Sequence, residues 1–253
     1  MSIMHIDFMS DKLGYQTNIY VILPESVNHG EKPSGILYLL HGGGGNGLDW
    51  IRNTNIERYA SPYNLAVVMP ETDGSCFYSD MKHGYPYFTY LTEEVPAAIE
   101  AMIPSLKNVE KKYVAGLSMG GYGAFKWAFN KPEYFTAAAN LSGISFVVDL
   151  MADTTHNLQG KSKVIENVWG SLDELRGSIS DSKFWIDNAA QNKTKLPKLF
   201  AGIGTKDFSY SFATDYIAYC NKMGIDIHYE EMPGIHDWNV WDEMIQRFLK
   251  WAI

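Results

Sequence analysis

The chain has 253 residues, 46% of them hydrophobic and 20% charged, so it can form one large domain or two small ones. The formal net charge is -8 and no dense Lys/Arg run offsets it, which argues against a nucleic-acid surface. Cys76 and Cys220 form neither a C-x-x-C motif nor a zinc spacing, and two idle thiols in a reducing cytosol are favoured over a disulfide.

The chain begins with MSIMHIDFMSDKLGYQ, which has no basic region and no long apolar stretch. This pattern argues against a signal peptide, and no run approaches the roughly 18 apolar residues of a membrane helix. A cytoplasmic protein that binds neither membrane nor nucleic acid is therefore expected. Residues 3–9 and 15–23 have strand patterns, and the turn at 10–14 between them predicts an antiparallel hairpin.

From residue 35 onward, strand and helix patterns alternate. Further strands are predicted at 35–40, 65–70, 112–118, 136–143, 197–204 and 226–233, and helices at 89–103, 120–130, 210–224 and from 239 onward. Pro96 predicts that the first of these helices is kinked or begins afresh there. Such alternation favours an α/β fold, with a mostly parallel twisted sheet and helices on both of its faces.

One segment, 144–196, interrupts this alternation. It contains SKVIENVWGSLDELRGSI, a pattern of short helices with charged faces. The segment is too long for a simple connection between two strands. We expect a small cap over the carboxyl edge of the sheet, where open α/β folds bind ligands, inserted into a single domain that spans 1–253.

The tract GLSMGG, residues 116–121, lies where a predicted strand ends and a helix begins. In that context G-x-S-x-G forms a tight turn that exposes the serine side chain above the sheet. The N-terminal amides of the following helix then point toward the site. Ser118 is therefore the candidate nucleophile, against the alternative of an ordinary glycine-rich turn.

A serine hydroxyl needs a contacting base, and the base needs a third group to hold it. In this architecture both follow the nucleophile, the acid first and then the histidine, each after a strand. Three histidines follow Ser118: His228 lies inside a strand pattern, His156 lies in the insertion, and His236 follows the last strand. His236 is therefore the candidate base.

The candidate acid is Asp207, which comes three residues after the strand that ends at Gly204. The aspartates at 153, 173 and 181 belong to the insertion, and Asp237 suits a cap of the last helix. We hypothesise that Ser118, Asp207 and His236 form a catalytic triad.

The glycine loop HGGGGNG, residues 41–47, allows two interpretations. Gly42, Gly44 and Gly47 satisfy the dinucleotide-binding G-x-G-x-x-G, with Glu71 as the ribose acid. The alternative is an oxyanion loop, in which the N–H of Met119 is joined by that of Gly43 or Gly44. The second interpretation is favoured because it also explains the triad. A P-loop is excluded, since no G-K-[ST] follows the glycines, and His41 is expected to bind the loop without taking part in catalysis.

With these residues identified, the chain resembles the esterase D branch of the α/β-hydrolases. The resemblance covers nearly the whole chain and is carried by LLHGGGGNGLDW, GLSMGGYGAFKWAFNKPEYFTAAANLSG, WGSLDEL and HDWNVW. It implies the α/β-hydrolase fold, the triad roles of Ser118, Asp207 and His236, an oxyanion amide from Met119, and no cofactor. Because the loop has four consecutive glycines, the resemblance leaves the second amide open between Gly43 and Gly44.

The substrate is less well defined by the sequence. Trp50, Phe77, Tyr78 and Tyr85 are the candidate binding residues. Four aromatic residues at 78, 85, 87 and 88 join Phe77 in the stretch 74–90, where they either stack on substrate or hold the loop together.

The favoured function is hydrolysis of short-chain acyl esters, acetyl or butyryl, or of carbohydrate-linked esters. Feruloyl esterase, S-formylglutathione thioesterase and acyl transfer to an alcohol are the enzymatic alternatives. A binding module on a hydrolase scaffold and a dinucleotide-dependent oxidoreductase are disfavoured, and the oligomeric state cannot be read from the sequence.

Overall fold

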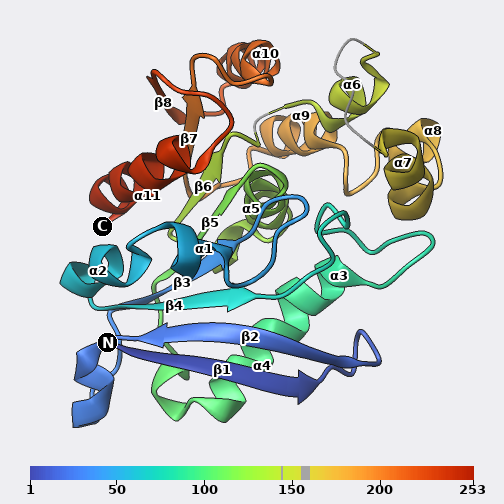
Figure 1. Ribbon diagram of the computed structural model, residues 1–253. Coiled ribbons are helices and arrows are strands. Elements are labelled where there is room, and N and C mark those ends of the chain that lie inside the picture. The colour runs from blue at the N-terminus through green and yellow to red at the C-terminus, as the bar shows by residue number, and fades with distance from the viewer. Residues whose placement is uncertain (144, 155–159) are drawn as a thin grey trace.

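A computed structural model describes residues 1–143, 145–154 and 160–253 of the chain. Within these residues one sheet of eight strands has the order β1-β2-β4-β3-β5-β6-β7-β8 (Figure 1). The strands are β1 Ser2–Met9, β2 Gln16–Leu23, β3 Gly35–Leu40, β4 Leu65–Pro70, β5 Lys112–Leu117, β6 Ala137–Leu141, β7 Lys198–Gly204 and β8 His228–Met232. The β1–β2 and β2–β4 pairs are antiparallel and the other pairs are parallel. The mostly parallel sheet and its N-terminal hairpin are thus confirmed.

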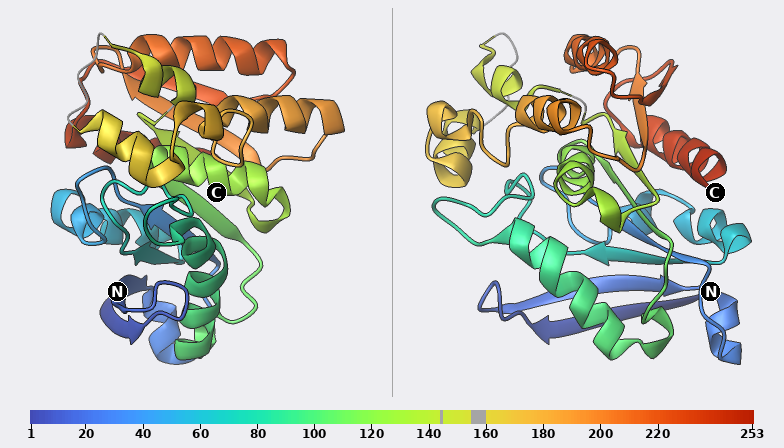
Figure 2. Two further views of the ribbon diagram at one scale, coloured as in Figure 1. Left: turned by 90° about the vertical axis from the view of Figure 1, so that its right-hand side faces the viewer. Right: turned by 180° about the vertical axis from the view of Figure 1, so that it is seen from behind.

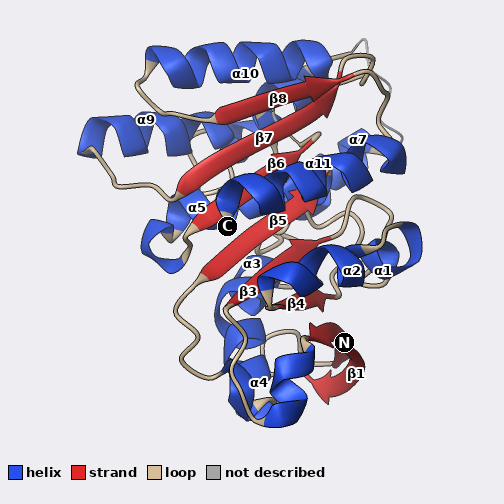
Figure 3. Cartoon of the chain, turned by 90° about the vertical axis from the view of Figure 1, so that its left-hand side faces the viewer, coloured by secondary structure: helices blue, strands red, loops and turns tan. Residues whose placement is uncertain are grey.

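Helices cover both faces of the sheet (Figures 2 and 3). They are α1 Asp49–Asn53, α2 Ile56–Ala60, α3 Tyr87–Thr89, α4 Val95–Met102, α5 Met119–Asn130, α6 Val147–Ala152, α7 Lys161–Trp169, α8 Leu172–Leu175, α9 Ser182–Asn192, α10 Tyr210–Lys222 and α11 Trp238–Ala252. Short 3-10 turns occupy Glu25–His29, Ser61–Tyr63, Pro104–Leu106 and Pro132–Tyr134.

The central strands are buried on both sides, which explains their continuous apolar runs. Because side chains alternate along a strand, β3 feeds two separate cores. Ile36, Tyr38 and Leu40 join the core that contains α4, α5, α9 and α10, whereas Leu37 and Leu39 join the core that contains α1, α2 and α11. The sheet is thus held between two layers of helices.

The helix predicted at 89–103 has an irregular turn just before Pro96. After α3 the chain makes a π-helical turn over Tyr90–Glu94, and α4 then begins with Pro96 in its first turn. Proline lacks the N–H of a regular helical hydrogen bond, and the wider π-helical turn directly before it accommodates this loss. The helix therefore continues through this π-helical turn and does not begin afresh at Pro96.

The structure describes residues 145–154 and 160–196 of the expected insertion, and His156 lies outside the described residues. The insertion contains α6 to α9. Helix α9 packs against α5, while α7 lies beyond the carboxyl ends of the parallel strands (Figure 3). Both cysteines are buried and carry free thiols. In the described part of the chain, no helix is long and apolar enough to span a bilayer.

Candidate active site

Ser118 lies in the turn between β5 and α5, with φ of 50° and ψ of -119°. Side-chain-bearing residues rarely adopt this conformation, and strain of this kind concentrates at functional sites. The turn also requires glycine on both sides. A Cβ on Gly116 would lie 2.3 Å from the carbonyl carbon of Gly120, and one on Gly120 would lie 2.5 Å from the carbonyl oxygen of His41. Close backbone packing thus fixes the serine at the carboxyl end of β5.

Two hydrogen bonds join the three predicted triad residues. His236 Nε2 lies 2.9 Å from Ser118 Oγ, and His236 Nδ1 lies 2.8 Å from Asp207 Oδ2. Since an ionised carboxylate only accepts, Nδ1 carries the proton and Nε2 is free to accept from the serine hydroxyl. The loops after β5, β7 and β8 therefore place a hydroxyl, a carboxylate and an imidazole, in that order, in one hydrogen-bonded group.

The Asp207 side chain is fully buried, and its carboxylate has three hydrogen-bond partners. Its Oδ1 accepts from the backbone N–H of Ser209 at 2.9 Å and from the Ser209 hydroxyl at 2.8 Å, while Oδ2 faces His236. Burial raises the pKa of this carboxyl, but hydrogen bonds and charge from His236, together with the Ser209 donors, leave the pKa below its usual value. The carboxylate is therefore ionised at neutral pH.

Aromatic rings flank the imidazole of His236. The Phe208 ring centroid lies 4.7 Å from that of His236, and the Trp241 ring meets it edge-on at 5.0 Å. Asp237 caps α11, since its side chain accepts from the N–H of Val240. The helix start and the two rings together restrict how the imidazole can rotate.

In the glycine loop, the backbone N–H groups of Gly43 and Gly44 differ in whether they already donate a hydrogen bond. Gly44 N–H donates to the carbonyl of Gly74 at 2.8 Å, and Gly45 N–H donates to that of Gly42 at 3.2 Å. Within the described residues the N–H of Gly43 has no acceptor, and a Cβ on Gly43 would lie 4.0 Å from the Cβ of Met119. Gly44 was one of two candidates for the second oxyanion donor, and its amide is already in use.

Two neighbouring side chains stabilise this loop. His41 is fully buried, and its Nδ1 donates to the carbonyl of Gly42 at 2.9 Å while Nε2 accepts from the Thr72 hydroxyl at 2.9 Å. The carboxylate of Glu71 accepts from Gly47 N–H at 2.8 Å. Glu71 is thus bound inside the loop, where it does not project as a ribose acid would.

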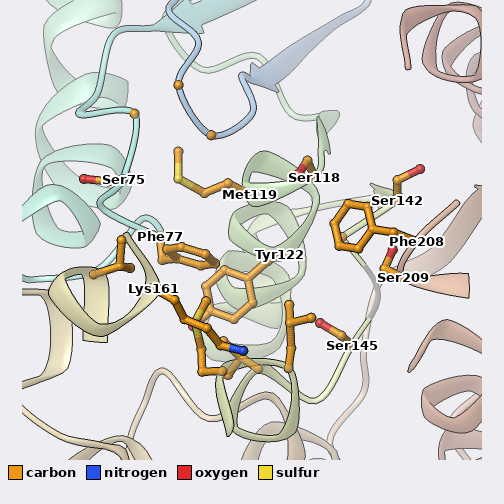
Figure 4. Close-up of a pocket in the computed structure, with 18 residues that line it drawn as sticks. Ser75, Phe77, Ser118, Met119, Tyr122, Ser142, Ser145, Lys161, Phe208 and Ser209 are labelled. Carbon is orange, nitrogen blue, oxygen red and sulfur yellow. The ribbon is translucent and has the colours of Figure 1, made fainter. Parts of the chain in front are cut away.

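A pocket of about 360 Å³ opens beside Ser118 and Met119 (Figure 4). Phe77 and Tyr122 form one wall, with their ring centroids 5.7 Å apart. Phe77 is directed there by an unusual turn, in which Phe77 and Tyr78 have φ of 46° and 42°. The wall from α6 and α7 is aliphatic and consists of Val147, Leu150, Met151 and Val164.

Of the four predicted substrate-binding residues, Phe77 alone lines this pocket. Trp50 is fully buried in the core, where its Nε1 donates to the carbonyl of Leu40 at 3.0 Å. Tyr78 is also fully buried, with its hydroxyl donating to the carbonyl of His41 at 2.9 Å. Tyr85 is 48% exposed and packs edge-on against Tyr15. Trp50, Tyr78 and Tyr85 therefore lie outside the lining of this pocket, because aromatic character does not reveal which face a ring occupies.

Several pocket residues were missed. Tyr122 follows Ser118 by four residues on α5, and this one-turn spacing is a signal that could have found it. Phe208, next to Asp207, lines the pocket as well. The aliphatic wall had no such signal, because the pattern of α6 and α7 does not show what they cover. Lys161, whose amine donates to the carbonyl of Asp153, also lines the pocket.

Comparison with known proteins gives consistent matches. The family model described as "Putative esterase" matches residues 10–252. An acetyl esterase of Caldicellulosiruptor saccharolyticus is 30% identical, over 99% of this chain and 98% of that protein.

Two solved structures from Staphylococcus aureus are similar over almost their whole length. FphF, a fluorophosphonate-binding serine hydrolase, has a TM-score of 0.88 and 31% identity, covering 99% of this chain and 98% of its own. The S-formylglutathione hydrolase FrmB has a TM-score of 0.85 and 32% identity, covering 100% of this chain and 99% of its own. With the strand order above, these matches confirm the expected α/β-hydrolase fold.

Proposed function

The chain belongs to this esterase family and is a carboxylesterase of the serine-hydrolase class, and from that premise we propose that Ser118, His236 and Asp207 hydrolyse esters of short carboxylic acids. One observation carries the proposal. The hydrogen bonds of 2.9 Å and 2.8 Å form an unbroken chain from the serine hydroxyl through the imidazole to the buried carboxylate. That arrangement has the geometry needed to activate a hydroxyl at neutral pH.

The reaction proceeds through an acyl-enzyme. His236 Nε2 takes the proton of Ser118 as Oγ attacks the ester carbonyl, and it then donates that proton to the departing alcohol. Water attacks the acyl-enzyme by the same route, with the imidazole again acting as the base. Asp207 keeps the proton on Nδ1 and stabilises the imidazolium that forms in each step.

The oxyanion binds to the amides of Met119 and Gly43 in this proposal. Met119 supplies the first N–H of α5, where the positive end of the helix dipole favours a developing negative charge. Gly43 is preferred to Gly44, because the Gly44 amide already donates to Gly74. Each such donor is worth about 10² to 10³ in turnover.

The pocket supports a short acyl group. Its volume of about 360 Å³ lies at the lower end of the range of roughly 300 to 1,000 Å³ for ligand pockets. The four aliphatic side chains of α6 and α7 would contact an acyl chain that extends away from Ser118. We expect kcat/KM on nitrophenyl esters to be highest for acetyl or butyryl and to fall for octanoyl.

The natural alcohol is open in this proposal. The acetyl esterase match supports acetyl groups, on simple or carbohydrate-linked alcohols. An S-formylglutathione hydrolase is the second candidate, supported by the 32% identity to FrmB and by the Lys161 amine, which offers a cation to a carboxylate of the peptide. A feruloyl group would stack on Phe77 and Tyr122. Side-by-side kcat/KM on butyryl, feruloyl and S-formylglutathione substrates separates these candidates.

Acyl transfer differs only in what attacks the acyl-enzyme. Adding a primary alcohol to a butyryl ester assay and measuring the ratio of new ester to free acid separates transfer from hydrolysis. We expect more free butyric acid than new ester, because hydrolysis is the proposed reaction. We also propose that 144–196 acts as a small cap of a single domain, since α6 and α7 supply one wall of the pocket.

Labelling with a fluorophosphonate tests the nucleophile directly. Intact-mass analysis is expected to show one adduct on the wild-type protein and none on Ser118→Ala. Ser75→Ala is the matched control, because Ser75 lines the same pocket and is exposed. That variant should label like the wild type. An adduct on folded Ser118→Ala, or none on the folded wild type, would overturn the assignment.

A further inference from the structure

The outer edge of β1 is open to pairing with another strand. β1 is the terminal strand of the sheet and, in the described ranges, pairs only with β2 (Figure 1, bottom). Three of its apolar side chains are exposed: Ile3 by 50%, Met4 by 36% and Met9 by 61%. Edge strands in monomers are usually short or protected by lysine, proline or a bulge. β1 has eight residues with neither lysine nor proline, its pairing with β2 has no bulge, and Asp7 is its one acidic side chain.

The two faces of β1 differ in chemistry. His5 and Asp7 lie on one face, where the His5 ring stacks on Tyr20 of β2 at 4.6 Å and His5 Nε2 lies 3.4 Å from Asp7 Oδ1. Ile3 and Met9 flank them on the same face, because side chains alternate along a strand. The opposite face carries Met4, Ile6 and Phe8, and the latter two pack against the core that contains α4.

We propose that this edge binds a second copy of the chain, with the two β1 strands antiparallel about a two-fold axis at Ile6. In that register His5 lies opposite Asp7 of the partner subunit, and the reciprocal pair repeats the contact. Ile3 then lies opposite the partner's Met9, and Met4 opposite the partner's Phe8. Every apolar side chain thus meets an apolar one, and each Asp7 carboxylate meets the imidazole of the partner's His5, which can donate a hydrogen bond to it.

Neighbouring registers lack this complementarity. Residues directly opposite one another share a face of the sheet, so a two-fold axis normal to the sheet must pass between two copies of one residue. An axis at His5 would place His5 against the partner's His5 and Ile3 against the partner's Asp7. An axis at Asp7 would place two carboxylates together, which is destabilising. Ile6 is therefore the centre that the sequence of β1 selects.

The mass in solution is the first test. Sedimentation across a concentration series is expected to approach twice the 28.5 kDa of one chain. His5→Asp sets a carboxylate against the partner's Asp7 at two symmetric places, and we expect the dissociation constant to rise about tenfold. The double variant His5→Asp with Asp7→His again places an imidazole opposite each carboxylate and should restore dimerisation. A monomeric wild type, or a His5→Asp variant that dimerises as well as the wild type, would overturn the proposal.

Crosslinking through introduced cysteines tests the register. Ile6→Cys should form a disulfide-linked dimer, and a mixture of Ile3→Cys with Met9→Cys should form a mixed dimer. Ile179→Cys is the matched control, since Ile179 is 51% exposed and lies in another part of the fold. The native thiols are buried and do not contribute. Crosslinking of the control and not of Ile6→Cys would show a different interface.

Esterase activity serves as the folding control for every variant. β1 contributes no side chain to the pocket, so each variant should keep the wild-type turnover. Loss of dimerisation with activity intact would bear on the edge strand alone, and the proposed function would be unaffected.

Discussion

Replacing Asp207 by asparagine is expected to reverse the proton position on His236. Asp207 Oδ1 accepts from the backbone N–H of Ser209, which can only donate. An asparagine must therefore keep its carbonyl oxygen toward Ser209 and turn its NH₂ toward His236 Nδ1. Nδ1 then has to accept, so the proton moves to Nε2 and faces Ser118. In that tautomer the imidazole cannot take the serine proton.

The size of the effect follows from this loss of the base. Fixing the wrong tautomer in a serine triad lowers kcat by about 10⁴-fold. At about 1.4 kcal/mol for each factor of ten, the transition state loses about 5.5 kcal/mol. The substrate contacts no part of Asp207, which is fully buried, so KM should change little.

Steady-state hydrolysis of a nitrophenyl butyrate provides the assay, at pH 7.5 and again near pH 9. Asp237→Asn is the matched control, because Asp237 is the next carboxylate along the chain from His236 and caps α11. That variant should keep kcat within a few-fold. A folded Asp207→Asn protein that retains more than about a tenth of the wild-type kcat would refute the role of Asp207.

Three further predictions concern stability. The free energy of unfolding of Ser118→Gly should exceed that of Ser118→Ala by at least about 1 kcal/mol, because glycine adopts a φ of 50° without strain and alanine does not. Equal stability of the two variants in urea would show that the turn is unstrained. Burial lowers the pKa of Lys126 to about 7. Between about pH 7 and pH 10 the unfolded state therefore binds a proton on this amine that the folded state has released. The free energy of unfolding of the wild type, relative to that of Lys126→Met, should rise across this pH range. A constant difference in urea titrations would contradict this. Tyr78→Phe removes the hydroxyl that donates to the His41 carbonyl, and it should lower the free energy of unfolding by about 1 to 3 kcal/mol in the same titrations. An unchanged urea midpoint would show that this hydrogen bond does not stabilise the fold.

The order of elements could be predicted because the sheet is buried on both faces. Runs such as residues 35–40 and 65–70 are continuously apolar, and the turns between them are marked by glycine and proline. The same order led to Asp207 and His236, since each follows a strand at the carboxyl edge of the sheet. These residues could be selected from their positions in the chain alone, and the structure places them within hydrogen-bond distance of one another.

Contacts between distant segments were beyond sequence reasoning. Gly44 could not be distinguished from Gly43 until its amide was seen to donate to Gly74, thirty residues further along the chain. Trp50 likewise follows the glycine loop, yet its indole turns toward the carbonyl of Leu40 in the core. Neither partner is encoded in local spacing, because each depends on how the chain folds back at the carboxyl edge of the sheet.

The wall of the pocket and the proposed catalytic residues come from different segments of the chain. The proposed catalytic residues follow β5, β7 and β8, whereas the aliphatic wall comes from α6 and α7. In the proposed arrangement, substitutions at Val147, Leu150, Met151 and Val164 would alter which acyl groups enter while leaving the hydrogen-bonded line of Ser118 and His236 in place. Acyl preference can then drift independently of the chemical step, and a library confined to these four positions should yield catalysts of altered chain-length range with undiminished fluorophosphonate labelling.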